Sequence, residues 1–243
     1  MCGRFAMATP RDDLVQIFSA GISNSESIEP NWNVSPSQSI YAITVSGSLS
    51  ETEVPIQNIS QSNRMLNLFK WGLIPSWAKD PSSIPKPINA RCETLASKPM
   101  FRKAFSHNRC LIPADGFFEW KRDPATKSKV PFYFSRPTGE VLAFAGLWET
   151  WHPADSPDTD VIRTCTIITT AANSDVRAVH DRMPAILENE TWDAWLETGE
   201  TSVDCLQELL RPAPGGTLSV RRVSQAVNRP VNNGPQLIET VEY

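Results

Sequence analysis

The chain has 243 residues, of which 40% are hydrophobic and 21% charged, so it is long enough to bury the core of one large domain or two small ones. A net charge of −4 argues against a protein that binds nucleic acid through overall positive charge, although a local basic groove is compatible with it. The five cysteines form no C-x-x-C pair and follow no apolar leader, and no apolar run could span a membrane. This argues against a thiolate zinc site and favours a reduced, intracellular protein.

Hydrophobic periodicity and turn residues predict short elements along the whole chain. In chain order they are a helix at 9–20, a loop at 20–38, a strand at 39–45, a loop or hairpin at 47–63, a strand at 64–75, a loop at 76–91, a helix at 97–107, two strands within 109–122, a hairpin at 130–150, a strand at 163–172, helices at 190–199 and 201–212, and a strand at 216–224. Thr9 and Ser97 are the predicted N-caps of the first two helices. Asp115-Gly116 separates the strands of 109–122, and a turn at Pro137-Thr138-Gly139 closes the predicted hairpin.

Strands outnumber helices in this pattern, and strands and helices do not alternate regularly. The sequence therefore predicts an α+β fold, with a mainly antiparallel sheet curled into a barrel-like core and a few flanking helices. Since no internal repeat or shift in composition marks a boundary, residues 1–243 are predicted to form a single domain.

The opening hexapeptide, MCGRFA, places a cysteine second in the chain. Terminal residues are usually frayed, yet removal of Met1 would give Cys2 a free α-amine beside its thiol. The ordinary pKa values of these two groups are about 8 and about 8.5, so a fraction of each is nucleophilic at neutral pH. Cys2 is therefore a candidate catalytic residue, and the other four cysteines are expected to be core or surface thiols.

Glu119 lies within an aromatic stretch, GFFEWK (116–121). If its side chain faces inward, burial would favour the protonated carboxyl and suit it to general acid–base catalysis. Strand alternation favours a different interpretation, in which Glu119 faces water while Phe118 and Trp120 face the core.

Five further polar or aromatic residues stand out, and each has a structural alternative. His180 could be a general base or orienting group, or could bond a backbone carbonyl. Arg91 and Arg182 offer planar forks for phosphate or carboxylate, or form surface ion pairs. Asn89 could contact a base edge or a sugar oxygen, or stabilise a turn. Trp77 could stack on a ligand, or fill the core from its proline-rich loop.

Ten stretches of the chain together resemble the SRAP family, named for SOS-response-associated peptidases and described as abasic-site processing proteins. They are MCGRFA, NWNVSPSQ (31–38), KWGLIPSWAKD (70–80), INARCET (88–94), MFRKAF (100–105), RCLIPADGFFEWKR (109–122), AGLWE (145–149), TIITTAAN (166–173), HDRMPAIL (180–187) and VSQAVN (223–228). They follow the family order, so the resemblance covers nearly the whole chain.

The resemblance implies a set of site residues. The catalytic residues that it implies are Cys2, Asn89, Glu119 and His180, and the DNA-binding residues are Arg4, Trp77, Arg91, Thr169 and Arg182. Ala78 departs from the pattern, because bacterial members often have a second tryptophan there, so the expected DNA-binding wedge is either narrower or built from other residues. The resemblance implies no metal and no cofactor.

The function implied by the resemblance is the sensing and processing of abasic sites in single-stranded DNA. After removal of Met1, the amine of Cys2 would form an imine with the ring-opened sugar, and the thiol would close a thiazolidine. Glu119 would move protons, Asn89 would hold a sugar or Schiff-base oxygen, and His180 would bond the opened sugar or the 3′ phosphate. The expected protein is a monomer, nuclear in a eukaryote or cytoplasmic in a bacterium.

Two other functions stay open. An N-terminal-nucleophile peptidase would use Cys2 to cut the Met1–Cys2 bond or another protein, with its own α-amine as the base. A non-catalytic reader of modified DNA bases would use the tryptophans and arginines alone.

Overall fold

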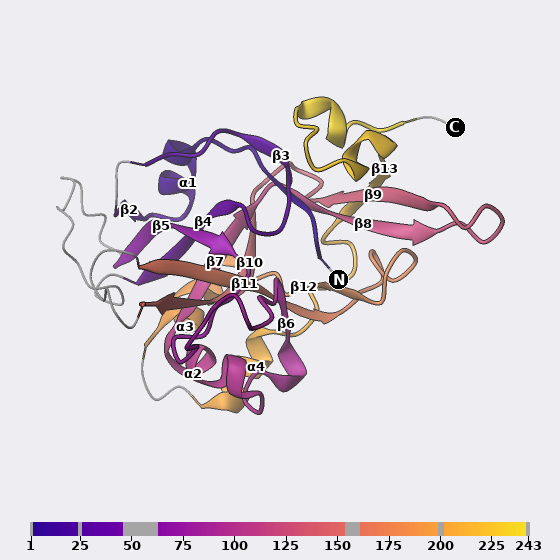
Figure 1. The fold of residues 1–243 in the computed structure, drawn as a ribbon. Coiled ribbons are helices and arrows are strands. Elements are labelled where there is room, and N and C mark those ends of the chain that lie inside the picture. Colours follow the sequence, from indigo (N-terminus) through magenta and orange to yellow (C-terminus); the bar gives the residue numbers. More distant parts are fainter. Residues whose placement is uncertain (1, 24–25, 46–62, 154–160, 199–201, 242–243) are drawn as a thin grey trace.

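Five strands close into a barrel at the centre of the molecule (Figure 1). They are β4 (Ser39–Val45), β5 (Arg64–Trp71), β7 (Arg109–Ala114), β10 (Leu142–Trp151) and β11 (Ile162–Ala171). Antiparallel pairing runs in the order β11-β10-β7-β4-β5, and a short parallel pairing of β5 with β11 closes the ring. The computed structural model describes residues 2–23, 26–45, 63–153, 161–198 and 202–241.

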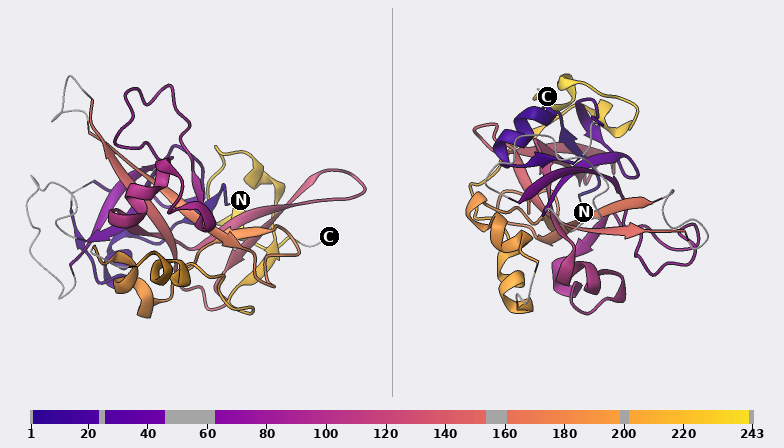
Figure 2. Two further views of the ribbon diagram at one scale, coloured as in Figure 1. Left: turned by 90° about the horizontal axis from the view of Figure 1, so that it is seen from below. Right: turned by 90° about the vertical axis from the view of Figure 1, so that its left-hand side faces the viewer.

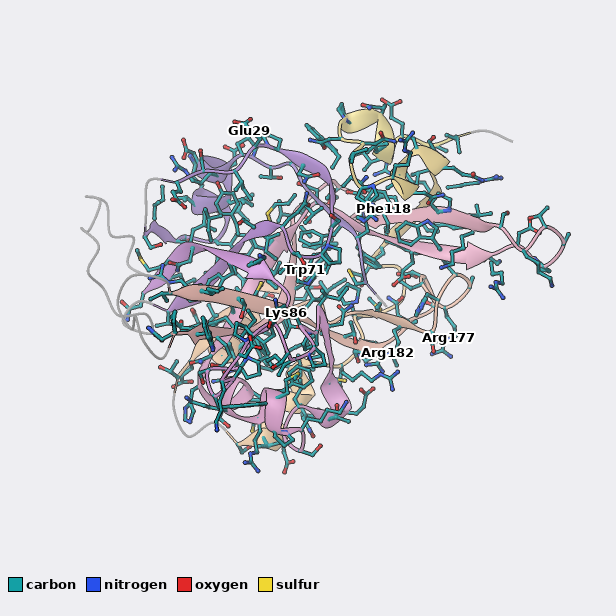
Figure 3. All side chains as sticks on the ribbon, in the orientation of Figure 1. Glu29, Trp71, Lys86, Phe118, Arg177 and Arg182 are labelled. Carbon is teal, nitrogen blue, oxygen red and sulfur yellow. The ribbon has the colours of Figure 1, made fainter. Side chains whose placement is uncertain are left out.

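Large apolar side chains from these strands form the main core. Trp71, which lies near the centre of Figure 3, is fully buried with Leu111 and Phe144. The indole N–H of Trp71 donates to the carbonyl of Ile88 at 2.8 Å, so the core contains no unpaired indole there. Burying each side chain of this size stabilises the fold by about 1.5–3 kcal/mol relative to exposure.

A second sheet stands beside the barrel. Its order is β13 (Ser219–Arg222), β9 (Lys129–Ser135), β8 (Gly116–Arg122), β1 (Phe5–Met7) and β3 (Asn31–Val34). Only Asp115 separates β7 of the barrel from β8, and its carboxylate accepts hydrogen bonds from the Ala8 amide and the Thr9 hydroxyl. The N-terminal end of the chain therefore enters the molecule where the two sheets meet, and it lies near the middle in both views of Figure 2.

Short elements complete the fold. β2 (Gly21–Ile22) extends the barrel sheet beside β5, while β6 (Asn89–Arg91) and β12 (Arg182–Pro184) both pair with β11. The helices are α1 (Arg11–Ile17), α2 (Pro99–His107), α3 (Trp192–Leu196) and α4 (Val203–Leu209), with 3₁₀ turns η1 (Cys92–Thr94), η2 (Asn189–Thr191), η3 (Gln225–Asn228) and η4 (Pro235–Ile238). Within the described ranges, no helix has the length and apolar character needed to cross a membrane.

The predicted fold class is confirmed, since the sheets are mainly antiparallel, curl into a barrel and carry short helices. The strand predicted at 39–45 matches β4, and the two strands predicted around Asp115-Gly116 match β7 and β8. The loop predicted at 20–38 is wrong in part, because it contains β2 and β3. The loop at 76–91 likewise ends in β6, and residues 47–62 lie outside the described part of the chain.

The hairpin predicted at 130–150 is wrong. Its turn is present, because the Gly139 amide donates to the Arg136 carbonyl at 3.1 Å. However, β9 pairs with β8 and β13, while β10 pairs with β7 and β11, so the turn carries the chain from the second sheet into the barrel. Local alternation cannot distinguish these outcomes, because each strand finds longer ladders elsewhere.

Both predicted N-caps are also wrong. α1 begins at Arg11 after Pro10, and the Thr9 hydroxyl bonds Asp115 instead of the helix. α2 begins at Pro99, and the Ser97 hydroxyl donates to the Thr94 carbonyl at 3.2 Å. In each case the N-cap position falls one residue later than predicted, on Pro10 and on Lys98, so the hydroxyl residue stands just outside the helix.

We expect the protein to lose stability in alkaline solution. Burial raises the pKa of the Cys110 and Cys165 thiols and of the Tyr133 phenol above their ordinary values. The unfolded chain releases these protons first, so the stabilisation declines above about pH 9 for the two thiols and above about pH 10 for the phenol. The decline should be roughly 1.4 kcal/mol per pH unit for each group.

Urea unfolding at a series of pH values above neutral measures this slope. Replacing both cysteines by alanine should make the decline shallower, because two of the titrating groups are then gone. Equal slopes for the double variant and the parent would contradict the assignment.

Candidate functional site

Cys2 is buried at the entry of the N-terminal strand. Its side chain is fully covered and packs with the main core. The strand that follows pairs with two neighbours, Phe5 lying opposite both Val34 and Phe117. This pairing holds the terminus in a defined place, whereas chain ends are usually frayed.

Glu119 lies on β8 beside this terminal segment. The amide of Phe118 donates to the Arg4 carbonyl at 2.9 Å, so the antiparallel ladder continues from Phe5 toward the terminus. Alternation places Glu119 on the same face of β8 as Phe117, which belongs to the main core. Glu119 is 3% exposed.

The interpretation that Glu119 faces water is therefore wrong. It assumed that only one face of β8 is covered. Phe118, labelled in Figure 3, packs into a second apolar cluster with Tyr133, while the opposite face of the strand rests on the main core. Both faces are buried, and the carboxylate lies on the side of Cys2.

The thiol of Cys2 is protonated at neutral pH. Burial raises its pKa, and the charge of Glu119 raises it further, while a hydrogen bond from the Arg4 amide opposes these effects. The two catalytic candidates are thus electrostatic neighbours. A carboxylate next to a protonated thiol is arranged to take up a proton when that thiol reacts.

Asn89 joins the terminus to the barrel. Its side-chain amide donates to the carbonyl of Cys2 at 2.8 Å, and β6, which begins at this residue, pairs in parallel with β11. The Asn89 Oδ1 atom is buried and accepts no hydrogen bond from the described residues. A buried acceptor of this kind is available to a ligand that brings a donor.

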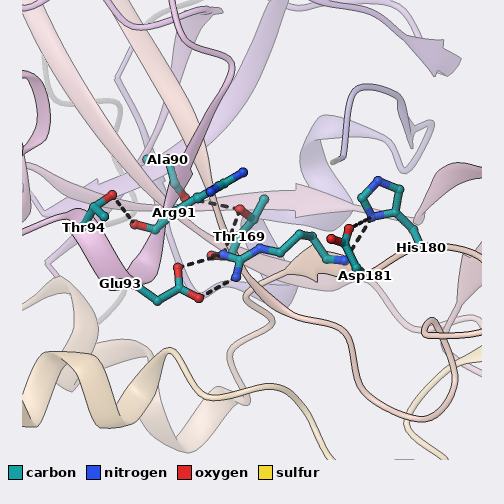
Figure 4. Close-up of polar contacts among 8 residues, drawn as sticks. Ala90, Arg91, Glu93, Thr94, Thr169, His180 and Asp181 are labelled. Carbon is teal, nitrogen blue, oxygen red and sulfur yellow. Dashed lines mark hydrogen bonds and ion pairs between the residues drawn. The ribbon is translucent and has the colours of Figure 1, made fainter.

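A second polar cluster lies where β6, β11 and β12 run side by side (Figure 4). Arg182 binds both carboxylate oxygens of Glu93, the second at 3.0 Å, and donates to the Thr169 carbonyl at 2.6 Å. Hydrogen bonds from Arg182 lower the pKa of Glu93. Arg91 lies opposite Thr169 in the ladder, is exposed, and its guanidinium bonds none of the described residues. Thr169 itself is fully buried.

His180 is half-buried just before β12. Its Nδ1 atom lies 2.9 Å from the Arg182 amide and 2.9 Å from a carboxylate oxygen of Asp181. A neutral ring that accepts the amide proton at Nδ1 carries its own proton on Nε2. A protonated ring would instead donate from Nδ1 to Asp181.

The side chains of two predicted site residues, Arg4 and Trp77, point away from these clusters. Arg4 donates to Asn33 at 2.7 Å and to the Val227 carbonyl at 2.9 Å, and lies over the ring of Trp120. Burial lowers its pKa. Arg4 thus joins β1 to the C-terminal segment, on the other face of the second sheet from Phe5.

Trp77 is 56% exposed, and the described contacts do not join it to Cys2. Its neighbours are fixed: Ser76 accepts from Lys103 at 3.3 Å, and the Ala78 carbonyl accepts from the Trp151 indole at 2.6 Å. The loop therefore holds an aromatic ring in solvent. Ala78 is buried against Trp151, which explains why no second large ring is presented there.

Sequence reasoning missed Glu93 and Asn33, which hold Arg182 and Arg4. Glu93 stands inside the INARCET stretch, so a search for acids near the candidate arginines would have found it. Asn33 also stands inside a matching stretch, NWNVSPSQ, but no local pattern shows its partners, because the C-terminal carbonyls that it bonds are distant in sequence. Among the described residues, no three His, Cys, Asp or Glu side chains gather in a way that could hold a metal ion.

Comparison with known proteins shows which family the chain matches. A sequence model of the SOS response associated peptidase (SRAP) family matches residues 1–230. The abasic site processing protein YoqW of Bacillus subtilis (strain 168) is 43% identical, over 99% of this chain and 100% of its own. The abasic site processing protein HMCES of Xenopus tropicalis is 29% identical, over 99% of this chain and 78% of its own.

A crystal structure of a Bacteroides thetaiotaomicron protein matches with a TM-score of 0.82 and 24% identity, over 99% of this chain and 100% of that one. At this identity the likeness supports the fold alone.

Replacing Asn89 by alanine should loosen the buried terminus. The lost hydrogen bond to the Cys2 carbonyl is worth about 0.5–1.5 kcal/mol, so the Cys2 thiol should react up to about tenfold faster with a thiol reagent. Peptide mass spectrometry after timed alkylation measures this rate. Buried Cys110 and Cys165 are internal controls, and an equal rise at all three would indicate general unfolding and contradict the prediction.

Proposed function

This chain belongs to the SOS response associated peptidase family, and from that premise we propose that it processes abasic sites in single-stranded DNA through a covalent bond to Cys2. Relatives that match nearly the whole chain are named abasic site processing proteins. The observation that carries the proposal is the burial of Cys2 between a carboxylate, Glu119, and the amide of Asn89.

The proposed reaction uses both nucleophiles of one residue. Removal of Met1 frees the α-amine of Cys2, which adds to the aldehyde of the ring-opened abasic sugar. The adduct loses one water and becomes an imine. The thiol sulfur then adds to the imine carbon while its proton passes to the nitrogen, which closes a five-membered thiazolidine. From the freed amine to the thiazolidine one water is lost, and no oxidant or reductant is needed.

Glu119 is proposed as the proton carrier of this sequence. It can deliver a proton to the departing hydroxyl and accept one from the buried thiol. The Asn89 amide holds the Cys2 carbonyl, and its buried Oδ1 can accept a hydrogen bond from the sugar or the amine. His180 can donate from Nε2 to the opened sugar or to the 3′ phosphate.

The DNA strand is proposed to lie along the polar cluster of β6, β11 and β12. Arg91 has an exposed guanidinium that bonds none of the described residues, and its planar shape suits a phosphate. Arg182 can bind a phosphate only by exchanging some of its bonds to Glu93 and Thr169. Trp77 can stack a base, which favours single strands because the ring would occupy the place of an opposing strand.

Single-stranded oligonucleotides containing uracil, with and without uracil excision, test the proposal. We expect an adduct that survives denaturation and requires the abasic site. Cys2→Ala should abolish this adduct, while Cys110→Ala, a control at another buried cysteine, should retain it. Cys2→Ser should form at most a weaker adduct, because its hydroxyl closes a less stable ring.

The same experiment separates the other functions. Cleavage of a peptide without a DNA adduct would favour the peptidase. Reversible binding of modified duplex DNA without any adduct would favour the reader of modified bases. Either result would contradict the proposal.

Glu119→Gln should slow adduct formation about a hundredfold without unfolding the protein, because general acid–base catalysis typically contributes this much. Single-turnover kinetics on the abasic oligonucleotide measure the rate. Glu190→Gln, at an exposed glutamate, is the matched control and should keep the parental rate. If Glu119→Gln forms the adduct at the parental rate, Glu119 does not transfer the proton, and the prediction is contradicted.

A further inference from the structure

The β8–β9 hairpin extends away from the body of the molecule, beyond the point where the N-terminus lies (Figure 1). Its outer part, residues 120–130, contains four basic side chains and a single acid, Asp123. The basic residues are Lys121, Arg122, Lys127 and Lys129. On a chain with a net charge of −4, this is a local concentration of positive charge.

These four basic side chains are exposed, and none of them forms a hydrogen bond or ion pair within the described part of the chain. Several arginines elsewhere are already neutralised. The described pairs include Arg64 with Asp193, Arg136 with Glu188, Arg182 with Glu93 and Arg211 with Glu208. The hairpin therefore offers cations that the fold itself does not use.

Two of the cations lie directly opposite each other. Arg122 and Lys129 are register partners at the outer end of the β8–β9 ladder. Like charges in this position destabilise a sheet. Asp123 is engaged in the turn, where its carboxylate accepts from the amides of Ala125 at 2.8 Å and Thr126 at 2.9 Å. An anion from outside the chain would offset the repulsion.

The hairpin is also continuous with the candidate site. Glu119 and Lys121 share a face of β8, so the strand that contains the buried carboxylate also contains basic side chains nearer its outer end. At a strand rise of about 3.3 Å per residue, Lys121 lies about 7 Å and Arg122 about 10 Å beyond Glu119. These positions lie outside the space that one sugar would fill.

We propose that the β8–β9 hairpin binds phosphates of the DNA strand a few nucleotides away from the abasic sugar. The inference rests on the proposed function and adds a second contact region to it. Phosphate contacts of this kind position a strand without reading its sequence. They also make affinity depend on salt, because each neutralised phosphate releases counterions.

The test compares the double variant Arg122→Gln, Lys129→Gln with a matched control, Lys98→Gln, Arg102→Gln, on and next to α2. All four residues are exposed, and Figure 1 places α2 away from the hairpin. Cys2→Ala in both backgrounds keeps binding reversible. The ligand is a single-stranded oligonucleotide with a central abasic site and about ten nucleotides on each side.

We expect the hairpin variant to bind several-fold more weakly at physiological salt. Its plot of log affinity against log salt should be less steep by about 1.4, since each phosphate contact on a single strand contributes about 0.7. The control should match the parent. On an oligonucleotide with a single nucleotide on each side of the lesion, the hairpin variant should also match the parent.

Stability provides an independent readout. Removing the like-charge pair should leave the free energy of unfolding unchanged or higher, so weaker binding in the hairpin variant would not reflect misfolding. An unchanged affinity and salt slope on the long oligonucleotide would overturn the inference, and so would an equal loss on the short one. The proposed function fails separately, if the parent protein forms no covalent adduct while its reversible binding still depends on the hairpin.

Discussion

The pairing of β1 between β8 and β3 is the constraint on which the site depends. Two ladders meet at Phe5, and Asp115 holds the chain just after the strand through Ala8 and Thr9. Because these contacts fix the strand, the residue three positions before Phe5 can be buried in the core. Cys2 is thereby placed against Glu119, and a chemically ordinary terminus acquires a neighbouring carboxylate.

β6 links this buried terminus to the surface where a DNA strand is proposed to lie. Asn89 at its first position holds the Cys2 carbonyl, and Arg91 two residues later is exposed. Both belong to one short strand whose position is set by β11 of the barrel. A change that shifted β6 would therefore disturb the reacting group and the phosphate contact together.

The arginines of the protein divide into two kinds. Arg4 and Arg182 make several hydrogen bonds inside the fold, so part of their role is to hold segments together. Arg91 and the cations of the β8–β9 hairpin have no such bonds among the described residues. This division explains how a chain of net charge −4 can still present positive charge where a phosphate backbone would need it.

Sequence patterns predicted the type of most elements, because barrel strands such as β4 and β11 are rich in the β-branched residues that favour strands. They could not predict strand partners, which is why the 130–150 segment was expected to form a hairpin. They also placed Glu119 in water, because alternation carries no information about a strand covered on both faces. The partners of Arg182 and Arg4 lie 89 and 223 residues away in the chain, beyond the reach of any local pattern. The residues of the proposed catalytic set stood out in the sequence as polar side chains, but their joint role was predicted from family resemblance and not from periodicity.

The most direct test of the covalent role of Cys2 is peptide mass spectrometry of the protein–DNA adduct after digestion with a nuclease and a protease. The DNA remnant should lie on a peptide that begins at Cys2, without Met1, and neither its amine nor its thiol should react with a blocking reagent. A remnant on another residue, or an adducted peptide that retains Met1, would contradict the account.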